Sequence, residues 1–487
     1  MSINPFYLHG EELTPVRKLL FMKALAGGAP LNEYEATGNP LTFTTNVAKP
    51  LKSLVASFTP IQSGTGDPSP ENVRSISGWS SLTAWHTGKN LLDVSQFTDS
   101  KVWWAGTLVN GYDTYKASNK ISVVPNAKYT LKKSATGQNQ LQYFDADGIF
   151  MSQDTSTFGN QVTTFTIPSD VYFIAINIAK TALDTAQLEV GNSASEYEAY
   201  SGTSFPVTFP ALGKNLFDKN NVVANTTWWK GNRVESSGNN SSAKIPVIPG
   251  ETYTLARTSV LQNTVCYFDS DGNYVSQDVT NWTTNPSTNV IPSGAYYVGF
   301  TVADDSLDSA MFVKGSSTGS YEPYNATVYG GSFDIVSGVL TKTTEIIDMG
   351  TLNWEYLSSY DCFRANVQQR SSATLDDYPS LVCEVYAFGG KNTSNSAMST
   401  APNSTIYTRT FDTSTTPIQW NAVYVKDTRY SDRDDLIEAL TGKYLAYELA
   451  EPVTYQLTPQ QVTALIGDNT IWSDANGTCE VTYLKKG

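Results

Sequence analysis

Short runs in which apolar and polar residues alternate recur along most of the chain. Examples are KYTLKK at 128–133, TTFTIP at 163–168 and YFIAINIA at 172–179, each bounded by turn-forming residues. Alternation with a period of two predicts strands that bury one face and expose the other. Their regular spacing is typical of antiparallel sandwiches. We therefore expect an all-β fold.

A long internal repeat organises the middle of the chain. The hexapeptide GKNLLD at 88–93 returns as GKNLFD at 213–218, and YFDADG returns as YFDSDG. The register holds until YEAY in the first copy and YEPY in the second. Self-similarity of this kind indicates repeated structural units. We expect two tandem β-sandwich modules, at residues 88–200 and 213–324.

The flanking segments differ from the repeats. Residues 33–87 contain two predicted strands and a turn-rich stretch, and they are too few to bury a stable core alone. We expect them to complete a mainly-β C-terminal domain, residues 325–487, which carries two short helices. One helix is predicted near 432–440 and the other at 458–467, where a threonine cap precedes a proline. The linker 201–212, with two prolines, is either an edge strand or a stiff spacer.

The N-terminal segment, residues 1–32, is predicted to hold a short helix. Thr14 and Pro15 favour its start, and Gly27 and Gly28 favour its end. It is too short to span a bilayer, and its flanks do not match an export signal. Its apolar residues cover more than one stripe, so it either folds back on its own domain or anchors the chain in a groove of a larger assembly. The anchoring residues would be Val16, Leu19, Leu20, Phe21, Met22 and Leu25.

Composition and charge narrow the possible functions. The net charge is −14 and the pI is about 4.7, which disfavours nucleic acid and anionic membranes as partners. His9 and His86 are the only histidines in the sequence, and the cysteines lack metal-ligand spacing. We expect no metal, no cofactor and no enzymatic activity, with a glycan depolymerase as the enzyme alternative. The four cysteines are Cys266, Cys362, Cys383 and Cys479.

Two acidic loops could suggest calcium. They are DADG at 145–148 and DSDG at 269–272, but the twelfth position of an EF-hand, which needs glutamate, holds Ser156 or Thr280. Asp-Gly between two apolar runs is instead typical of a tight hairpin turn. We expect hairpins at both places; the alternative for calcium is a site elsewhere in the modules, which would leave no local motif.

A tryptophan pair occurs once in each repeat, as Trp103 with Trp104 and as Trp228 with Trp229. Adjacent residues of a strand point to opposite faces, so one ring of each pair should be buried and the other exposed. An exposed indole could stack on the apolar face of a sugar, or it could pack against a neighbouring module. The polar neighbours that could bind sugar hydroxyls are Asn225, Lys230, Asn232 and Arg233.

Three segments resemble a known group of proteins. The segment 36–79, which contains SGTGDPSPENVR, and the segment 443–484, which begins KYLAYELAEPVTYQLTP, resemble minor structural proteins of tailed phages of Gram-positive gut bacteria. The GKNLFD modules resemble the carbohydrate-binding-like jelly rolls of phage fibres. The chain departs from the pattern at Ser75, where proline is expected, which puts one turn in doubt.

This resemblance implies a virion protein, made in the host cytoplasm and extracellular in the mature particle. It would be a tail or head fibre, held to other virion proteins by the N-terminal helix, whose two jelly-roll modules bind a host cell-surface glycan. A homo-oligomer, such as a trimer, is expected for a fibre. The alternative is a capsid decoration or head-fibre protein whose modules serve as spacers and bind no glycan.

Overall fold

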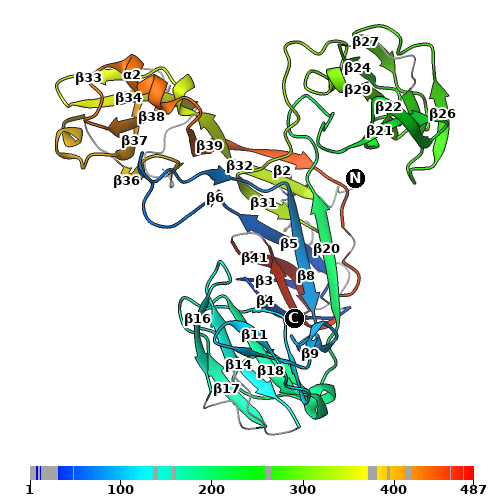
Figure 1. Cartoon of the computed structure of the whole chain (residues 1–487), viewed down its shortest axis with the longest axis vertical. Coiled ribbons are helices and arrows are strands. Elements are labelled where there is room, and N and C mark those ends of the chain that lie inside the picture. Colours follow the sequence, from blue (N-terminus) through cyan, green and yellow to red (C-terminus); the bar gives the residue numbers. More distant parts are fainter. Residues whose placement is uncertain are drawn as a thin grey trace. The chain divides into compact units, whose positions relative to one another are not determined.

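The computed structural model describes residues 7–8, 11–12, 31–47, 49–134, 141–155, 161–258, 265–370, 381–391, 395–412, 419–460, 462–474 and 477–486. The fold is mainly β, as the alternating pattern predicts, and α2 (Arg433–Leu440) is the α-helix of the described part (Figure 1). The predicted N-terminal helix and its six anchoring residues lie outside the described residues. The chain divides into two compact units, residues 1–207 with 328–487 and residues 208–327.

The first repeat forms two sheets and a separate hairpin. One sheet has the order β16 (Phe150–Asp154), β15 (Leu141–Phe144), β18 (Phe173–Ala179), β12 (Tyr115–Ala117) and β9 (Thr98–Asp99), with β13 (Ile121–Ser122) also on β18. The other has the order β17 (Val162–Thr166), β14 (Lys128–Lys132) and β19 (Gln187–Val190). The hairpin joins β10 (Lys101–Trp104) to β11 (Thr107–Asn110).

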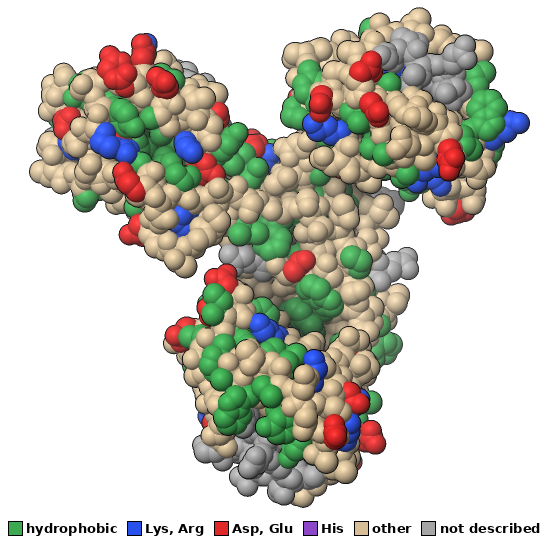
Figure 2. All heavy atoms as spheres, viewed as in Figure 1, with side chains coloured by type: hydrophobic (Ala, Val, Ile, Leu, Met, Phe, Trp, Pro, Cys, Tyr) green, Lys and Arg blue, Asp and Glu red, His purple; other side chains and the backbone are tan. Residues whose placement is uncertain are grey.

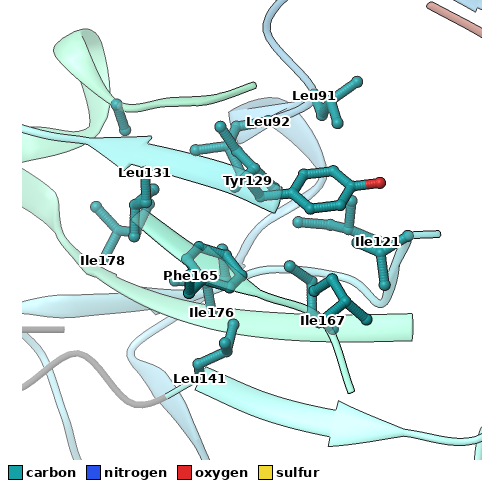
Figure 3. Close-up of a cluster of buried hydrophobic side chains, with 14 of the residues drawn as sticks. Leu91, Leu92, Ile121, Tyr129, Leu131, Leu141, Phe165, Ile167, Ile176 and Ile178 are labelled. Atoms are coloured by element: carbon teal, nitrogen blue, oxygen red, sulfur yellow. The ribbon is translucent and has the colours of Figure 1, made fainter. Parts of the chain in front are cut away.

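The core of this module lies between its two sheets. Tyr129 and Leu131 of β14 share one buried cluster with Leu141 of β15 and Ile176 of β18 (Figure 3). Because side chains alternate along a strand, β15 also has an outer face, yet all four of its residues are buried. The outer face therefore needs its own cover, which the β10–β11 hairpin provides by placing Trp103 on Phe144.

The second repeat has the same plan. One sheet has the order β23 (Ile245–Pro246), β28 (Tyr297–Gly299), β25 (Val265–Phe268) and β26 (Tyr274–Asp278), and the facing sheet has β27 (Ser287–Val290), β24 (Thr252–Ala256) and β30 (Met311–Lys314). The hairpin joins β21 (Val222–Trp229) to β22 (Asn232–Ser242), which also pairs with β29 (Thr301–Ala303). The central strand of this module, β25, is thus also covered on both of its faces.

The GKN tripeptide closes each module. In the second repeat Asn215 is 1% exposed, and its amide group donates to the backbone oxygens of Ala310 and Glu322 at 3.3 and 3.0 Å. Its Oδ1 accepts the N–H groups of Phe217 and Phe312 at 3.0 and 3.1 Å. One side chain thus fixes the start of the module to its end. The first repeat makes the same four hydrogen bonds through Asn90 to Ala186, Glu198, Leu92 and Leu188.

Residues on both sides of the repeats form shared sheets. One sheet has the order β3 (Leu31–Gly38), β41 (Cys479–Lys486), β5 (Leu51–Phe58), β31 (Gly330–Asp334), β32 (Val339–Asp348), β39 (Tyr444–Gln456) and β35 (Val382–Cys383). A second has the order β20 (Gly202–Thr208), β8 (Ser81–Thr87), β40 (Gly467–Ser473) and β4 (Leu41–Thr45). Strands from 31–87 therefore pair with strands from 328–487 in both sheets. The linker contributes β20, an edge strand that tolerates Pro206 because an edge leaves one row of N–H groups unpaired.

The remaining C-terminal residues form a smaller lobe. Its sheet has the order β33 (Glu355–Leu357), β34 (Cys362–Arg370), β38 (Gln419–Lys426), β37 (Thr405–Asp412) and β36 (Ala387–Lys391). Helix α2 packs on it and starts where predicted, with Asp432 accepting the Asp434 N–H at 2.7 Å. The buried carboxylate of Asp427 forms an ion pair with the partly exposed Arg429, and it also accepts the hydroxyl hydrogen of Tyr386.

The second expected helix, at 458–467, is wrong in the described residues. Residues 458–460 and 462–466 form no helix, and β40 begins at Gly467. The N–H groups of Leu457 and Gln460 instead donate to the backbone oxygens of Gly338 and Ile335 at 2.7 and 2.9 Å. Backbone pairing with a distant turn therefore replaces the local hydrogen bonds that cap residues alone would favour.

Candidate ligand-binding surface on the tryptophan hairpins

Each tryptophan pair ends the first strand of a tight hairpin. The turn of the second module consists of Lys230 and Gly231, with φ of 47° and 78°, and that of the first consists of Ala105 and Gly106, with φ of 45° and 77°. Positive φ at both positions is the turn whose twist matches paired strands. Glycine is required for a second reason, because a Cβ on Gly231 would lie 2.5 Å from the Cβ of Tyr274. The hairpin tip therefore rests directly on β26.

The first tryptophan of each pair is structural. Trp228 is 3% exposed, and its ring meets that of Phe268 edge-on at 5.2 Å and 65°. Its indole N–H donates to the Ser242 carbonyl at 3.0 Å, so the buried polar atom has a partner. The first module repeats the arrangement at 5.4 Å and 72° between rings. Its residues are Trp103, Phe144 and Ser118.

The second tryptophan of each pair is exposed, as the alternation of a strand predicts. Trp104 is 48% exposed and Trp229 is 46% exposed. Asn232 lies opposite Trp229 in the ladder and donates to the Lys230 carbonyl at 3.3 Å. The Lys230 ammonium is 5.8 Å from the centre of the Trp229 ring. The tip of this hairpin thus presents an aromatic face beside an amide and a cation.

Two further expected site residues lie elsewhere on the hairpin. Arg233 places its guanidinium 4.6 Å from the Trp228 ring and donates to Ser241 Oγ and the Ser242 carbonyl, both at 3.0 Å. Partial burial lowers its pKa. Arg233 therefore covers the buried ring instead of bordering the exposed one. Asn225 has a φ of 55° and lies at a bulge that interrupts the β21–β22 ladder between Ala224 and Thr226, so it lies away from the tip.

A glutamine that sequence reasoning missed fixes each turn. Gln277 of β26 accepts the Lys230 N–H at 2.7 Å, and Gln153 of β16 accepts the Ala105 N–H at 3.0 Å. Both glutamines belong to an SQD sequence that the two repeats share, and that identity was the available signal. The exposed rings are therefore held on turns that are pinned to the module.

The acidic loops are hairpin turns. In DSDG, Asp269 Oδ1 accepts the N–H groups of Asp271 and Asn273 at 3.0 and 2.8 Å, and these bonds lower the pKa of Asp269. The carboxylate thus stabilises the turn itself. Among the residues that the structure describes, no three His, Cys, Asp or Glu side chains come together as a metal site.

The four cysteines are buried and unpaired, and burial raises the pKa of each thiol. They behave as small apolar residues. On the face shown in Figure 2, lysines and arginines are scattered among acidic residues and do not form one basic patch. Within the described ranges, no helix is long and apolar enough to cross a membrane.

A scan against protein families found no matching family model, and a search of curated proteins found no matching sequence.

Proposed function

We propose that this chain is a phage virion fibre protein that adsorbs to a host cell-surface glycan through the exposed tryptophans of two tandem jelly-roll modules. The observation that supports it most is the duplicated exposure of Trp104 and Trp229, each nearly half exposed at the tip of a hairpin whose other tryptophan is buried. An indole fixed in this way loses little conformational entropy when a ligand stacks on it.

The chemistry of the tip suits a sugar. The CH groups of a pyranose ring can pack on the Trp229 face, and hydroxyl groups can bind the Lys230 ammonium and the Asn232 amide. In the first module the equivalent positions hold Ala105 and Thr107. The second module therefore supplies more polar specificity, whereas the first supplies mainly the aromatic contact.

Single shallow sites bind weakly, at about millimolar Kd or roughly 4 kcal/mol. Two modules in each chain, multiplied by a homo-oligomer such as a trimer, increase the apparent affinity through effective concentration. In this proposal the N-terminal segment, residues 1–32, attaches the fibre to other virion proteins. The net charge of −14 favours a glycan that is not strongly anionic.

The test is sedimentation of the full chain with insoluble cell walls and purified wall polysaccharide from Gram-positive gut bacteria. We expect the double variant Trp104→Ala/Trp229→Ala to lose at least about tenfold in apparent affinity, since stacking contributes roughly 1 kcal/mol at each site. A matched control is Tyr172→Ala/Tyr296→Ala, which removes another duplicated pair of exposed aromatic rings (44% and 47% exposed).

Equal sedimentation of the tryptophan variant and the unmodified chain would refute glycan binding at the hairpins and favour the spacer alternative. The same incubation is assayed for new reducing ends. Their appearance would favour a depolymerase.

A further inference from the structure

The second module contains a pocket of about 250 Å³ where its two ends meet. Pro210 and Ala211 of the incoming chain and Tyr324 of the outgoing chain line it. A hydrogen bond of 2.7 Å from the Leu212 N–H to the Asn325 carbonyl holds these two segments together. The pocket is therefore built by the closure of the module.

The pocket is lined by apolar side chains together with a few polar groups. Leu216, Phe217 and Ile245 are among the apolar residues. Asp218 and Tyr324 are among the polar ones, and this mixture is the usual character of a small-molecule site. At about 250 Å³ it is smaller than most such sites, which start at roughly 300 Å³, so it suits a single ring.

The two polar groups retain hydrogen-bonding capacity. Asp218 Oδ1 accepts the Asn220 N–H at 2.9 Å, and its other carboxylate oxygen has no hydrogen-bond partner among the described residues. The Tyr324 hydroxyl likewise has none in that part of the chain. Burial and the nearby Asp218 raise the pKa of Tyr324, so its hydroxyl stays protonated and can donate. A ligand hydroxyl could bind both groups.

The cation of the pocket is already engaged. Lys244 donates to the Gly272 carbonyl at 2.6 Å and lies 4.3 Å from the centre of the Phe268 ring. Asp218 adds a carboxylate with an unused acceptor oxygen, which disfavours anionic ligands. The first module keeps the acid as Asp93 and the phenol as Tyr200. The pKa of Tyr200 is raised in the same way. Its wall differs, since Leu92, Asn119 and Ser122 replace Phe217, Ala243 and Pro246.

We propose that this pocket binds one uncharged sugar ring, as a glycan contact of the second module distinct from the hairpin tip. Its apolar wall would take the CH face of the ring, while Asp218 and Tyr324 would bind the hydroxyls. The sugar class follows the proposed function, but Trp229 does not line the pocket, so the two sites can be tested separately.

The experiment is ligand-observed saturation-transfer NMR on the full chain. The probes are the methyl glycosides of glucose, galactose, mannose and N-acetylglucosamine, with glucuronate as the anionic comparison. We expect saturable millimolar binding of at least one neutral glycoside and weaker binding of glucuronate. Asp218→Asn and Tyr324→Phe should each weaken it by at least about fivefold, the effect of one lost hydrogen bond.

Two further variants keep the test decisive. Asn221→Ala changes an exposed residue of the pocket wall, so it should weaken binding even if a substitution at Asp218 affects folding. Asp93→Asn in the first module should leave binding unchanged. The proposal is overturned if no glycoside saturates below about 50 mM, well above the range of single sugar sites. Equal loss in Asp93→Asn and Asp218→Asn would also overturn it.

The result of the glycoside-binding test can be told apart from the result of the sedimentation test of the proposed function. Glycoside binding that Asp218→Asn weakens, without polysaccharide sedimentation, would support the pocket and contradict adsorption through the hairpins. Sedimentation that depends on the two exposed tryptophans, without glycoside binding, would support the hairpins and contradict the pocket.

Discussion

Replacing Asn215 by alanine should unfold the second module more readily than almost any other single polar substitution. The side chain is 1% exposed and makes four hydrogen bonds, to Ala310, Glu322, Phe217 and Phe312. Alanine leaves two backbone N–H groups and two carbonyls without this partner. At roughly 1 kcal/mol for each bond, the loss in the free energy of unfolding is about 4 kcal/mol. For a unit of this size it lowers Tm by about 15 °C.

The assay is calorimetry of the full chain, in which the compact unit 208–327 should melt in its own transition. Asn215→Ala should move that transition, and Asn90→Ala, its counterpart in the first module, should move another. Asn215→Asp keeps the acceptor oxygen but turns a carboxylate toward two carbonyls, so it should destabilise at least as much. Asn232→Ala, an exposed control, should change little.

A loss below about 1 kcal/mol for Asn215→Ala would refute the reasoning, because it would mean that water replaces the amide without cost. A shift of the same transition by Asn90→Ala would show instead that the two modules do not unfold independently.

Two more outcomes follow from burial. Trp228→Ala should lower the free energy of unfolding by about 3–5 kcal/mol in urea titrations. Trp229→Ala should change it by no more than about 0.5 kcal/mol. Equal losses would contradict the division into buried and exposed rings. Burial also lowers the pKa of Lys133 from 10.5 to about 8. Between these two pH values the unfolded chain binds more protons than the native chain, so stability should rise with pH. Thermal melts against Lys133→Met measure this, and a pH-independent difference would count against it.

Local sequence determined the parts of the structure that depend on local rules. Period-two alternation predicted the β-rich fold, and the same rule placed one tryptophan of each pair inside and the other outside. The expected helix near 432–440 is also correct, and the cap hydrogen bond that starts α2 joins Asp432 to Asp434, only two residues apart. These features need no knowledge of distant partners.

Tertiary structure alone decided which distant residues meet. The GKN motif marked a repeat in the sequence, but its function depends on Glu322, more than a hundred residues away from Asn215 in the chain. Arg233 was expected beside the exposed ring and instead covers the buried one, because Ser241 and Ser242 of the same strand capture its guanidinium. Backbone and side-chain hydrogen bonds form with whatever the fold brings near, and that proximity is set by long-range strand pairing, which a local pattern does not encode.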